Sequence, residues 1–368
     1  MANNIPMMKV NEAVEKLGVC YERIIKSNLP FKDMPSVMLW GAPGIGKSQL
    51  VRELAEQMRA KTGKKVNVTD VRLILFNPVD LRGIPTSNQD KTLSVWLKPK
   101  IFDMDTSNEV LNILFLDEIS AAPQSVQAAA YQITLDRVIG EHKLPDNCLV
   151  IAAGNRVTDR SVAYKMPRAL ANRLMHIEIV PDFESWNEWA VSNGINDKVI
   201  GFLSFKQDYL NESNITNDDL AFPTPRTWEM VSNILNNISS DMDFAYSLIC
   251  GLVGSGVASE FKAWCKIYKG LPNIEGIFNG TELNLPKGTD QLYALTSSMI
   301  SHAKECEDQP KKIEHSIEYA LRMPPDFACV LLKGYQNISP EFAKKLMKIP
   351  TYIKWLNTRG KLLNGIIR

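Results

Sequence analysis

Residues 41–48 read Gly-Ala-Pro-Gly-Ile-Gly-Lys-Ser. It fits in full the pattern of a phosphate-binding loop, in which two glycines separated by four residues are followed by Lys and then Ser or Thr. An apolar run over Ser36–Trp40 precedes the loop and predicts a buried strand, and Gln49–Arg59 shows the apolar spacing of a helix. Strand, glycine-rich loop and helix in this order predict the opening of a nucleotide-binding α/β domain.

Each residue type in this loop has a physical role. Glycines let the backbone N–H groups curl around phosphates, and the N-terminus of the following helix adds a favourable dipole. Lys47 supplies positive charge to the β- and γ-phosphates, and the hydroxyl of Ser48 is placed to coordinate Mg²⁺. The predicted nucleotide-contacting residues of the loop are Gly41, Ala42, Pro43, Gly44, Ile45, Gly46, Lys47, Ser48 and Gln49.

A second candidate strand ends in two acids, Asp117 and Glu118, after the apolar run 113–116. Ligands of open α/β sheets bind at the carboxyl ends of the strands, so Asp117 is a candidate ligand of Mg²⁺. Glu118 would orient or deprotonate an attacking water. Two adjacent carboxylates at a strand end often form only a solvated turn, and it is the phosphate loop that favours the functional interpretation.

A third candidate strand, Leu149–Ala153, leads through Gly154 to Asn155. An asparagine at this strand tip could hydrogen-bond the γ-phosphate or the attacking water. A lone Asn after a strand is usually a turn residue, so this interpretation depends on its neighbours.

Further buried strands are expected at Val71–Phe76 and Ile177–Val180, with helices between them. This alternation predicts a parallel sheet between helices, that is, an α/β domain over 1–181. After Pro181 the patterns are helical, and a Gly/Pro/Asn-rich stretch near 270–290 marks a weaker break. We therefore expect a helical lid over 182–288 and a helical C-terminal extension over 289–368.

Composition limits the function classes. The 368 residues suggest two or three domains, with 45% hydrophobic and 23% charged residues, as in globular proteins. A formal net charge of +1 encodes no bulk attraction to nucleic acid or to an anionic membrane. The basic pairs Lys311–Lys312 and Lys344–Lys345 fit a solvated helix face, so nucleic-acid binding has little support.

No membrane span or signal peptide is expected, and the longest uncharged stretch, Phe244–Ser259, predicts a buried helix. Six dispersed cysteines without a Cys-x-x-Cys pair predict buried free thiols and a cytoplasmic location. The four histidines are isolated, so Mg²⁺ accompanying ATP is the one metal expected.

The order of phosphate loop, acidic strand end, strand-tip Asn and the segment Met-Pro-Arg-Ala-Leu-Ala-Asn-Arg-Leu (166–174) resembles an AAA+ ATPase. More narrowly, it resembles the MoxR family of the helix-2-insert clade, over roughly residues 30 to 265. The stretch Asp-Leu-Arg-Gly-Ile-Pro (80–85) matches the start of that family's inserted hairpin. The resemblance implies two inserted hairpins, at about 86–97 and 136–145.

By the same resemblance, Arg173 takes the place of an arginine finger that reaches the nucleotide of the adjacent subunit. Arg226 matches a lid arginine that senses the nucleotide of its own subunit. Asn172 and Leu174 depart from the Asp and Phe that often flank the finger, and Arg156, Arg160 and Arg168 leave the choice of the trans-acting arginine open. A surface ion pair for Arg173 and a simple helix start at Arg226 are the plainer alternatives.

The resemblance implies a Mg²⁺-ATP-hydrolysing motor that assembles as a ring, usually of six subunits, and remodels a protein client. A partner with a von Willebrand factor type A domain is a further implication. Two alternatives are a motor stimulated by nucleic acid and a slow switch that assembles in response to nucleotide.

Overall fold

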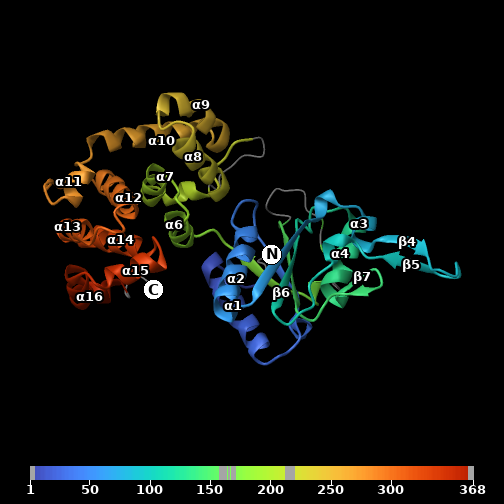
Figure 1. The fold of residues 1–368 in the computed structure, drawn as a ribbon. Helices are drawn as coiled ribbons and strands as arrows, with labels where there is room; N and C mark the ends of the chain where they lie inside the picture. Colours follow the sequence, from blue (N-terminus) through green and yellow to red (C-terminus); the bar gives the residue numbers. More distant parts are fainter. Residues whose placement is uncertain (1–4, 157–163, 165, 167–170, 212–219, 364–368) are drawn as a thin grey trace. The chain divides into compact units, whose positions relative to one another are not determined.

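The computed structural model describes residues 5–156, 164, 166, 171–211 and 220–363 of the chain. The chain divides into two compact units, Met1–Asp182 and Phe183–Arg368. The first contains a parallel sheet between helices and the second is helical throughout its described part (Figure 1). The predicted fold class is confirmed.

The sheet of the first unit has six parallel strands in the order β1-β10-β2-β9-β6-β3. Their bounds are β1 (Met7–Met8), β2 (Val37–Trp40), β3 (Lys65–Arg72), β6 (Val110–Asp117), β9 (Cys148–Gly154) and β10 (Met175–Ile179). The central strands β6 and β9 are almost entirely buried because helices cover both faces. Strand order therefore differs from chain order, which brings the ends of β2, β9 and β6 side by side.

Two hydrophobic cores lie on opposite faces of this sheet. Helices α1 (Val10–Lys26) and α2 (Lys47–Thr62) pack on one face through residues such as Leu17, Leu50 and Leu54. On the other face, α3 (Pro78–Arg82) and α4 (Gln124–Asp136) bury Leu81 and Ile133, among others. The three layers hold the strand ends rigidly at one edge.

The strand expected at Val71–Phe76 was misplaced. Strand β3 runs over Lys65–Arg72, and the apolar residues after it form a 3₁₀ turn, Leu73–Leu75, in which Leu75 is 74% exposed. Because β3 is an edge strand, its burial alternates, and only Val66 and Val71 are fully buried. A search for continuous apolar runs could not detect such a strand.

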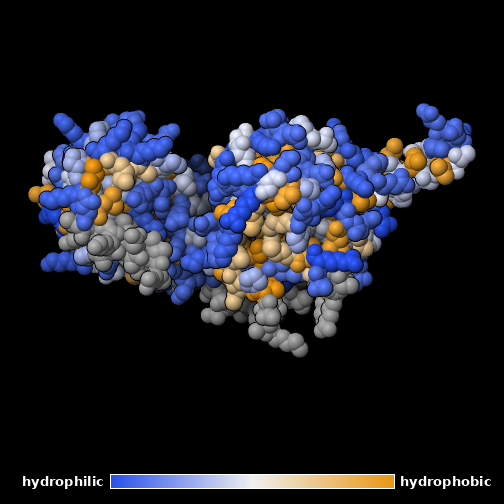
Figure 2. All heavy atoms as spheres, turned by 90° about the horizontal axis from the view of Figure 1, so that it is seen from below, coloured by the Kyte–Doolittle hydropathy of each residue, from blue (hydrophilic) through white to orange (hydrophobic). Residues whose placement is uncertain are grey.

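Two antiparallel hairpins interrupt the α/β pattern. The first joins β4 (Ile84–Ser87) and β5 (Ser94–Leu97), so it starts two residues before the predicted Thr86, and it projects from the body of its unit (Figure 1). Figure 2 shows hydrophobic residues along this projection, where Ile84, Leu93 and Leu97 are 61%, 66% and 57% exposed. The second hairpin, β7 (Val138–Ile139) and β8 (His142–Lys143), contacts the first because Nε2 of His142 hydrogen-bonds the Trp96 carbonyl at 2.8 Å.

The second unit is built from short helices, five of which carry a proline at their first position, where its missing N–H costs no hydrogen bond. They are α6 (Phe183–Ser192), α7 (Asp197–Phe205), α8 (Pro225–Asn237), α9 (Met242–Val253), α10 (Ser255–Ile267), α11 (Ile274–Phe278), α12 (Thr289–Glu305), α13 (Pro310–Ala320), α14 (Pro325–Gln336), α15 (Pro340–Leu346) and α16 (Pro350–Leu363).

One continuous core extends from Trp186 to Trp355, across both segments that the sequence separated near residue 288. Trp186 and Trp264 are buried and Trp189 packs against the same core.

The single buried helix expected at Phe244–Ser259 is wrong. Gly254, at φ +80°, ends α9 and begins α10, and Phe244 and Leu248 are 57% and 44% exposed. In the described part of the chain, no helix combines the length and the apolar composition needed to cross a membrane. Gly251 lies in α9 and Gly256 in α10.

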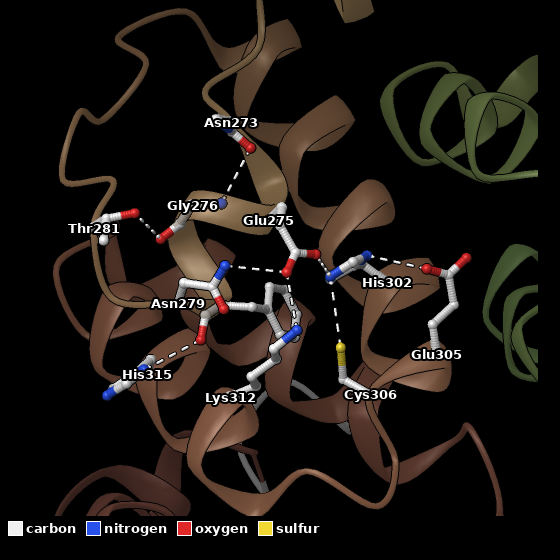
Figure 3. Close-up of polar contacts among 11 residues, drawn as sticks. Asn273, Glu275, Gly276, Asn279, Thr281, His302, Glu305, Cys306, Lys312 and His315 are labelled. Carbon is white, nitrogen blue, oxygen red and sulfur yellow. Dashed lines mark hydrogen bonds and ion pairs between the residues drawn. The ribbon is translucent and has the colours of Figure 1, made fainter.

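A polar network joins three helices of this unit around Glu275 of α11 (Figure 3). Its carboxylate accepts hydrogen bonds from Lys312 of α13 at 2.9 Å and from Asn279 at 3.1 Å, and lies 3.0 Å from Nε2 of His302 on α12. The second ring nitrogen of His302 lies 3.2 Å from Glu305. These contacts tie α11 to the helices beyond the predicted break at 288.

All six cysteines are free thiols. Four are buried, Cys250 is half-buried and Cys20 is exposed. The expectation of six buried thiols was therefore wrong for Cys20, which lies on the solvent side of α1, where helical periodicity turns it away from the core.

Candidate nucleotide-binding site

Three adjacent strands end at one edge of the sheet and carry the predicted site residues. The glycine-rich loop follows β2, Asp117 ends β6, and Asn155 follows β9, which lies between β2 and β6. The chain crosses to β10 on the other side of β2, so β2 is the topological switch point at which open α/β sheets bind ligands. The order of the strands thus brings together residues that are over a hundred positions apart.

The loop depends on backbone conformations that favour glycine. Gly41, Gly44 and Gly46 have φ values of +153°, +79° and +103°. A Cβ on Gly41 would also lie 2.8 Å from the carbonyl oxygen of Ile179, so this position has no room for a side chain. Gly46 accepts the first helical hydrogen bond of α2 from the N–H of Leu50 at 2.8 Å, which points the helix N-terminus at the loop.

The other loop residues are arranged around this curve. Ile45 is buried in the core beneath the loop, Ala42 and Gly44 are half-buried, and Pro43 is exposed. Gln49 donates to Glu53 along α2 at 3.2 Å. Ile45 therefore anchors the loop to the hydrophobic core, while Pro43 on the outer side of the loop faces solvent.

Lys47 is buried and its ammonium group lies at the centre of the site. It donates to the carbonyl oxygens of Gly41 at 2.5 Å and Ala42 at 2.9 Å, and to Oδ1 of Asn155 at 3.0 Å. These hydrogen bonds fix the position of the ammonium group beside the loop. These contacts and the curled glycines fit the phosphates of a nucleotide.

Ser48 and Asp117 form the oxygen pair that a magnesium ion would use. Oγ of Ser48 donates to Oδ2 of Asp117 at 3.1 Å, and Oδ1 of Asp117 accepts from the N–H of Glu118 at 2.8 Å. Hydroxyl and carboxylate oxygens are the donors that Mg²⁺ prefers, so this pair fits the ion. In the part of the chain that the structure describes, no cluster of three His, Cys, Asp or Glu side chains forms a further metal site.

Glu118 adopts a strained conformation next to this pair. Its φ of +58° lies in the left-handed region, which costs roughly 1–2 kcal/mol for a residue with a Cβ. Its side chain is half-buried and makes no hydrogen bond with another described residue. Strain of this kind persists where the surrounding structure holds it, often at functional sites.

Asn155 is held from its backbone side by Ser120. The N–H of Asn155 donates to Oγ of Ser120 at 2.9 Å. A Cβ on the preceding Gly154 would lie 2.8 Å from the same oxygen and from the methyl carbon of Met38. Glycine at 154 therefore lets Ser120 approach Asn155 and direct its carboxamide to Lys47.

Asp70 of β3 adds a further carboxylate near the site. Partial desolvation raises the pKa of Asp70, and the negative charge of Asp117 raises it further, while Arg72 and Arg52 act in the opposite direction. The carboxylates of Asp70 and Asp117 therefore lie close enough to interact electrostatically.

The candidate arginines occupy different places. Arg173 is exposed before the first residue of β10, so at least four strand residues, about 13 Å, separate it from the loop end of the sheet. Arg156 lies directly after Asn155, and Arg160 and Arg168 fall outside the described residues. Arg226 is exposed in the first turn of α8 in the second unit, behind the N-cap Thr224.

Sequence reasoning missed four residues that support the site: Ser120, Trp40, His176 and Glu178. The polar side chains of His176 and Glu178 alternate with apolar ones in the otherwise buried β10. That pattern is a usable sign, because a buried polar side chain needs a partner.

Residues 36–176 match the model of the family described as ATPase family associated with various cellular activities (AAA). A comparison with curated proteins finds no match.

Similar solved structures include a protein of Cytophaga hutchinsonii to which ATPase activity is ascribed, 17% identical, covering 90% of this chain and 85% of that chain at a TM-score of 0.33. A mutant of RuvB from Thermotoga maritima is 15% identical, with 79% and 84% covered and a TM-score of 0.35. NtrX from Brucella abortus in complex with ATP is 13% identical, with 93% and 65% covered and a TM-score of 0.35. At these values the structures carry no argument about function.

The fold and the site define an α/β protein with a phosphate-type loop at the switch point of a parallel sheet. The family match narrows this class, because residues 36–176 are similar to the AAA ATPase family model. Proteins of this family generally bind ATP together with Mg²⁺.

Proposed function

We propose that this protein is a Mg²⁺-dependent ATPase of the MoxR type that works as a ring. The observation that carries the proposal is the convergence of Lys47, bonded to Asn155 at 3.0 Å, and Ser48, bonded to Asp117 at 3.1 Å, at one edge of the sheet. A phosphate-binding cation and a pair of magnesium-binding oxygens at this spacing suit a nucleoside triphosphate with its metal.

The residues divide the chemistry among themselves. Bound Mg²⁺-ATP supplies the phosphoryl group to be transferred. Lys47 neutralises phosphate charge, Ser48 and Asp117 hold the ion, and the loop N–H groups orient the phosphates. Glu118 accepts a proton from the attacking water, and Asn155 positions that water or the γ-phosphate.

Arg173 acts on the neighbouring subunit in this proposal. Its exposed position beyond the opposite end of β10 suits a contact with a second copy better than with its own phosphate loop. A head-to-tail contact of this kind closes into a ring, and we propose six subunits, as is usual in the MoxR family. Arg226 would sense nucleotide from the helical unit.

The hairpins are the proposed contact with a protein client. Ile84, Leu93 and Leu97 expose apolar surface on a projecting arm, which favours binding of a protein. A partner with a von Willebrand factor type A domain would present the client. The second unit would move with the nucleotide state and transmit work.

Light-scattering mass and phosphate release test the proposal together. We expect wild type to shift from a lower mass to about six subunits with ATP and to release phosphate steadily. Glu118→Gln should assemble with ATP while its turnover falls about 10²-fold or more. A mass of one subunit in every nucleotide state would overturn the ring.

The same assay separates the alternatives. A burst of hydrolysis without steady turnover would favour a nucleotide-dependent switch. Stimulation by DNA or RNA that weakens steeply with salt would favour a nucleic-acid motor. Mixing Glu118→Gln and Arg173→Ala subunits tests the trans contact. In one of the two orientations of a mixed interface, the Arg173→Ala subunit supplies an intact Glu118 and the Glu118→Gln subunit supplies an intact Arg173.

A further inference from the structure

An ion pair connects the two strands that flank the phosphate-loop strand. Nη1 of Arg156, the residue after Asn155, donates to Oε1 of Glu178 on β10. Glu178 is only 5% exposed, so its carboxylate is largely removed from water. A buried carboxylate requires a charged partner of good geometry, and Arg156 is that partner.

The strand register makes this pair a bridge over β2. Trp40, the last residue of β2, is in register with Gly154 on β9 and with Glu178 on β10. Two strand spacings, about 10 Å, separate β9 from β10. The long side chain of Arg156 therefore crosses the end of β2 at the point where the phosphate loop begins.

Asn155 is thus fixed from both sides. Ser120 holds its N–H at 2.9 Å, and the next residue is tied to β10 through Glu178. Its carboxamide oxygen receives the hydrogen bond of Lys47 at 3.0 Å. Because the peptide is held on both sides, the carboxamide has little freedom to leave the phosphate site.

We propose that Glu178 and Arg156 are positioning residues that hold the Asn155 carboxamide against Lys47 and the terminal phosphate of the nucleotide. This inference rests on the proposed function and deepens it. It also engages Arg156 within its own subunit, which leaves Arg173 as the described arginine suited to act in trans.

The test compares binding of ADP with binding of a non-hydrolysable ATP analogue to the full chain, by fluorescence titration. The variants are Asn155→Ala, Glu178→Gln and the double variant. If Glu178 acts through Asn155, each single variant should weaken analogue binding about tenfold more than ADP binding. The double variant should then be no weaker than Asn155→Ala alone.

Additive losses in the double variant, or equal losses for ADP and the analogue, would overturn the inference. Arg156→Lys is the second variant, because it keeps the charge beside Glu178 but shortens the reach across β2 and loses the guanidinium fork. It should reproduce the selective loss even if Glu178→Gln does not fold.

Wild type separates this inference from the proposed function. Wild type that binds the analogue selectively but releases no phosphate would refute ATP hydrolysis and leave the positioning role standing. Steady hydrolysis by wild type, together with additive losses of analogue binding in the double variant, would refute the positioning role but not the proposed function. Wild type that binds neither nucleotide would refute both.

Discussion

The indole N–H of Trp40 donates to Nδ1 of His176 at 2.8 Å, and the two rings stack with centroids 6.0 Å apart. Because indole can only donate, Nδ1 must be unprotonated. Nε2 therefore carries the proton and donates to the carbonyl of Ala171 at 2.7 Å. This chain of hydrogen bonds links the residue before the phosphate loop to the turn that contains Arg173, at the opposite end of the sheet.

Breaking the hydrogen bond between Trp40 and His176 should destabilise the protein and disconnect the phosphate-loop end of the sheet from the turn that contains Arg173. We expect Trp40→Phe to lower the free energy of unfolding by about 1 kcal/mol through the lost hydrogen bond, in addition to a packing loss. A double-mutant cycle with His176→Phe, in which urea unfolding measures the free energy of each variant, gives the coupling energy between Trp40 and His176. A coupling energy near zero would show that the contact contributes nothing.

Gly83 precedes the first hairpin, and Gly63, which also has a positive φ, provides a control position outside it. A Cβ on Gly83 (φ +92°) would lie 1.9 Å from the carbonyl oxygen of Leu97, whereas a Cβ on Gly63 (φ +70°) would meet nothing within 4 Å. Gly63→Ala should cost about 1 kcal/mol of backbone strain. Gly83→Ala should cost about 3 kcal/mol, because the backbone of β5 must also move. Equal losses in thermal unfolding would contradict the steric account.

Acidification should weaken the network of Figure 3 in a defined direction. The hydrogen bond from Lys312, followed by that from Asn279, lowers the pKa of Glu275 below its ordinary value. A carboxyl with a lowered pKa contributes stability above its unfolded pKa, about 4.3, and that contribution is lost as the pH falls through the lower folded value.

We therefore expect Glu275→Gln to reduce the fall in Tm between pH 6 and pH 3. Lys312→Met should reduce it as well, and the double variant should add little, since both remove the same pair. An unchanged pH dependence in both single variants would contradict this role of Glu275.

The cysteines should differ sharply in reactivity. Burial raises the pKa of the Cys148 and Cys265 thiols to about 12, and the thiolate is the reactive form. Exposed Cys20 should therefore be alkylated first by iodoacetamide at pH 8, as measured by mass spectrometry of the native protein. Cys20→Ser should remove the fast phase, whereas rapid labelling of Cys148 would contradict the buried position.

The parts of the fold that depend on neighbouring residues in the chain were predictable. The strand, loop and helix around Gly41–Ser48 appear as β2, the loop and α2, because their apolar spacing and glycines act within a few residues. Edge strand β3 was misplaced because half of its side chains face water, and Phe244–Ser259 was misread because Gly254 breaks it.

The candidate site was predictable as a set of residues and not as an arrangement. Lys47 and Ser48 stood out through the loop pattern, and Asp117, Glu118 and Asn155 through their places at the ends of buried strands. The structure brings all five to one edge of the sheet. Ser120, Trp40, His176 and Glu178 escaped notice, since their partners lie on other strands and a single polar residue in a strand has no local periodicity.

By itself, the sequence determined that a phosphate-type loop joins a buried strand to a helix, and that acids and an asparagine follow other strands. Only the tertiary structure decided that β9 inserts between β2 and β6 and that β10 flanks β2 on the far side. Strand order depends on how helices cover both faces of the sheet, a non-local packing condition. That order is what brings Asn155 to Lys47 and carries Arg156 across β2 to Glu178.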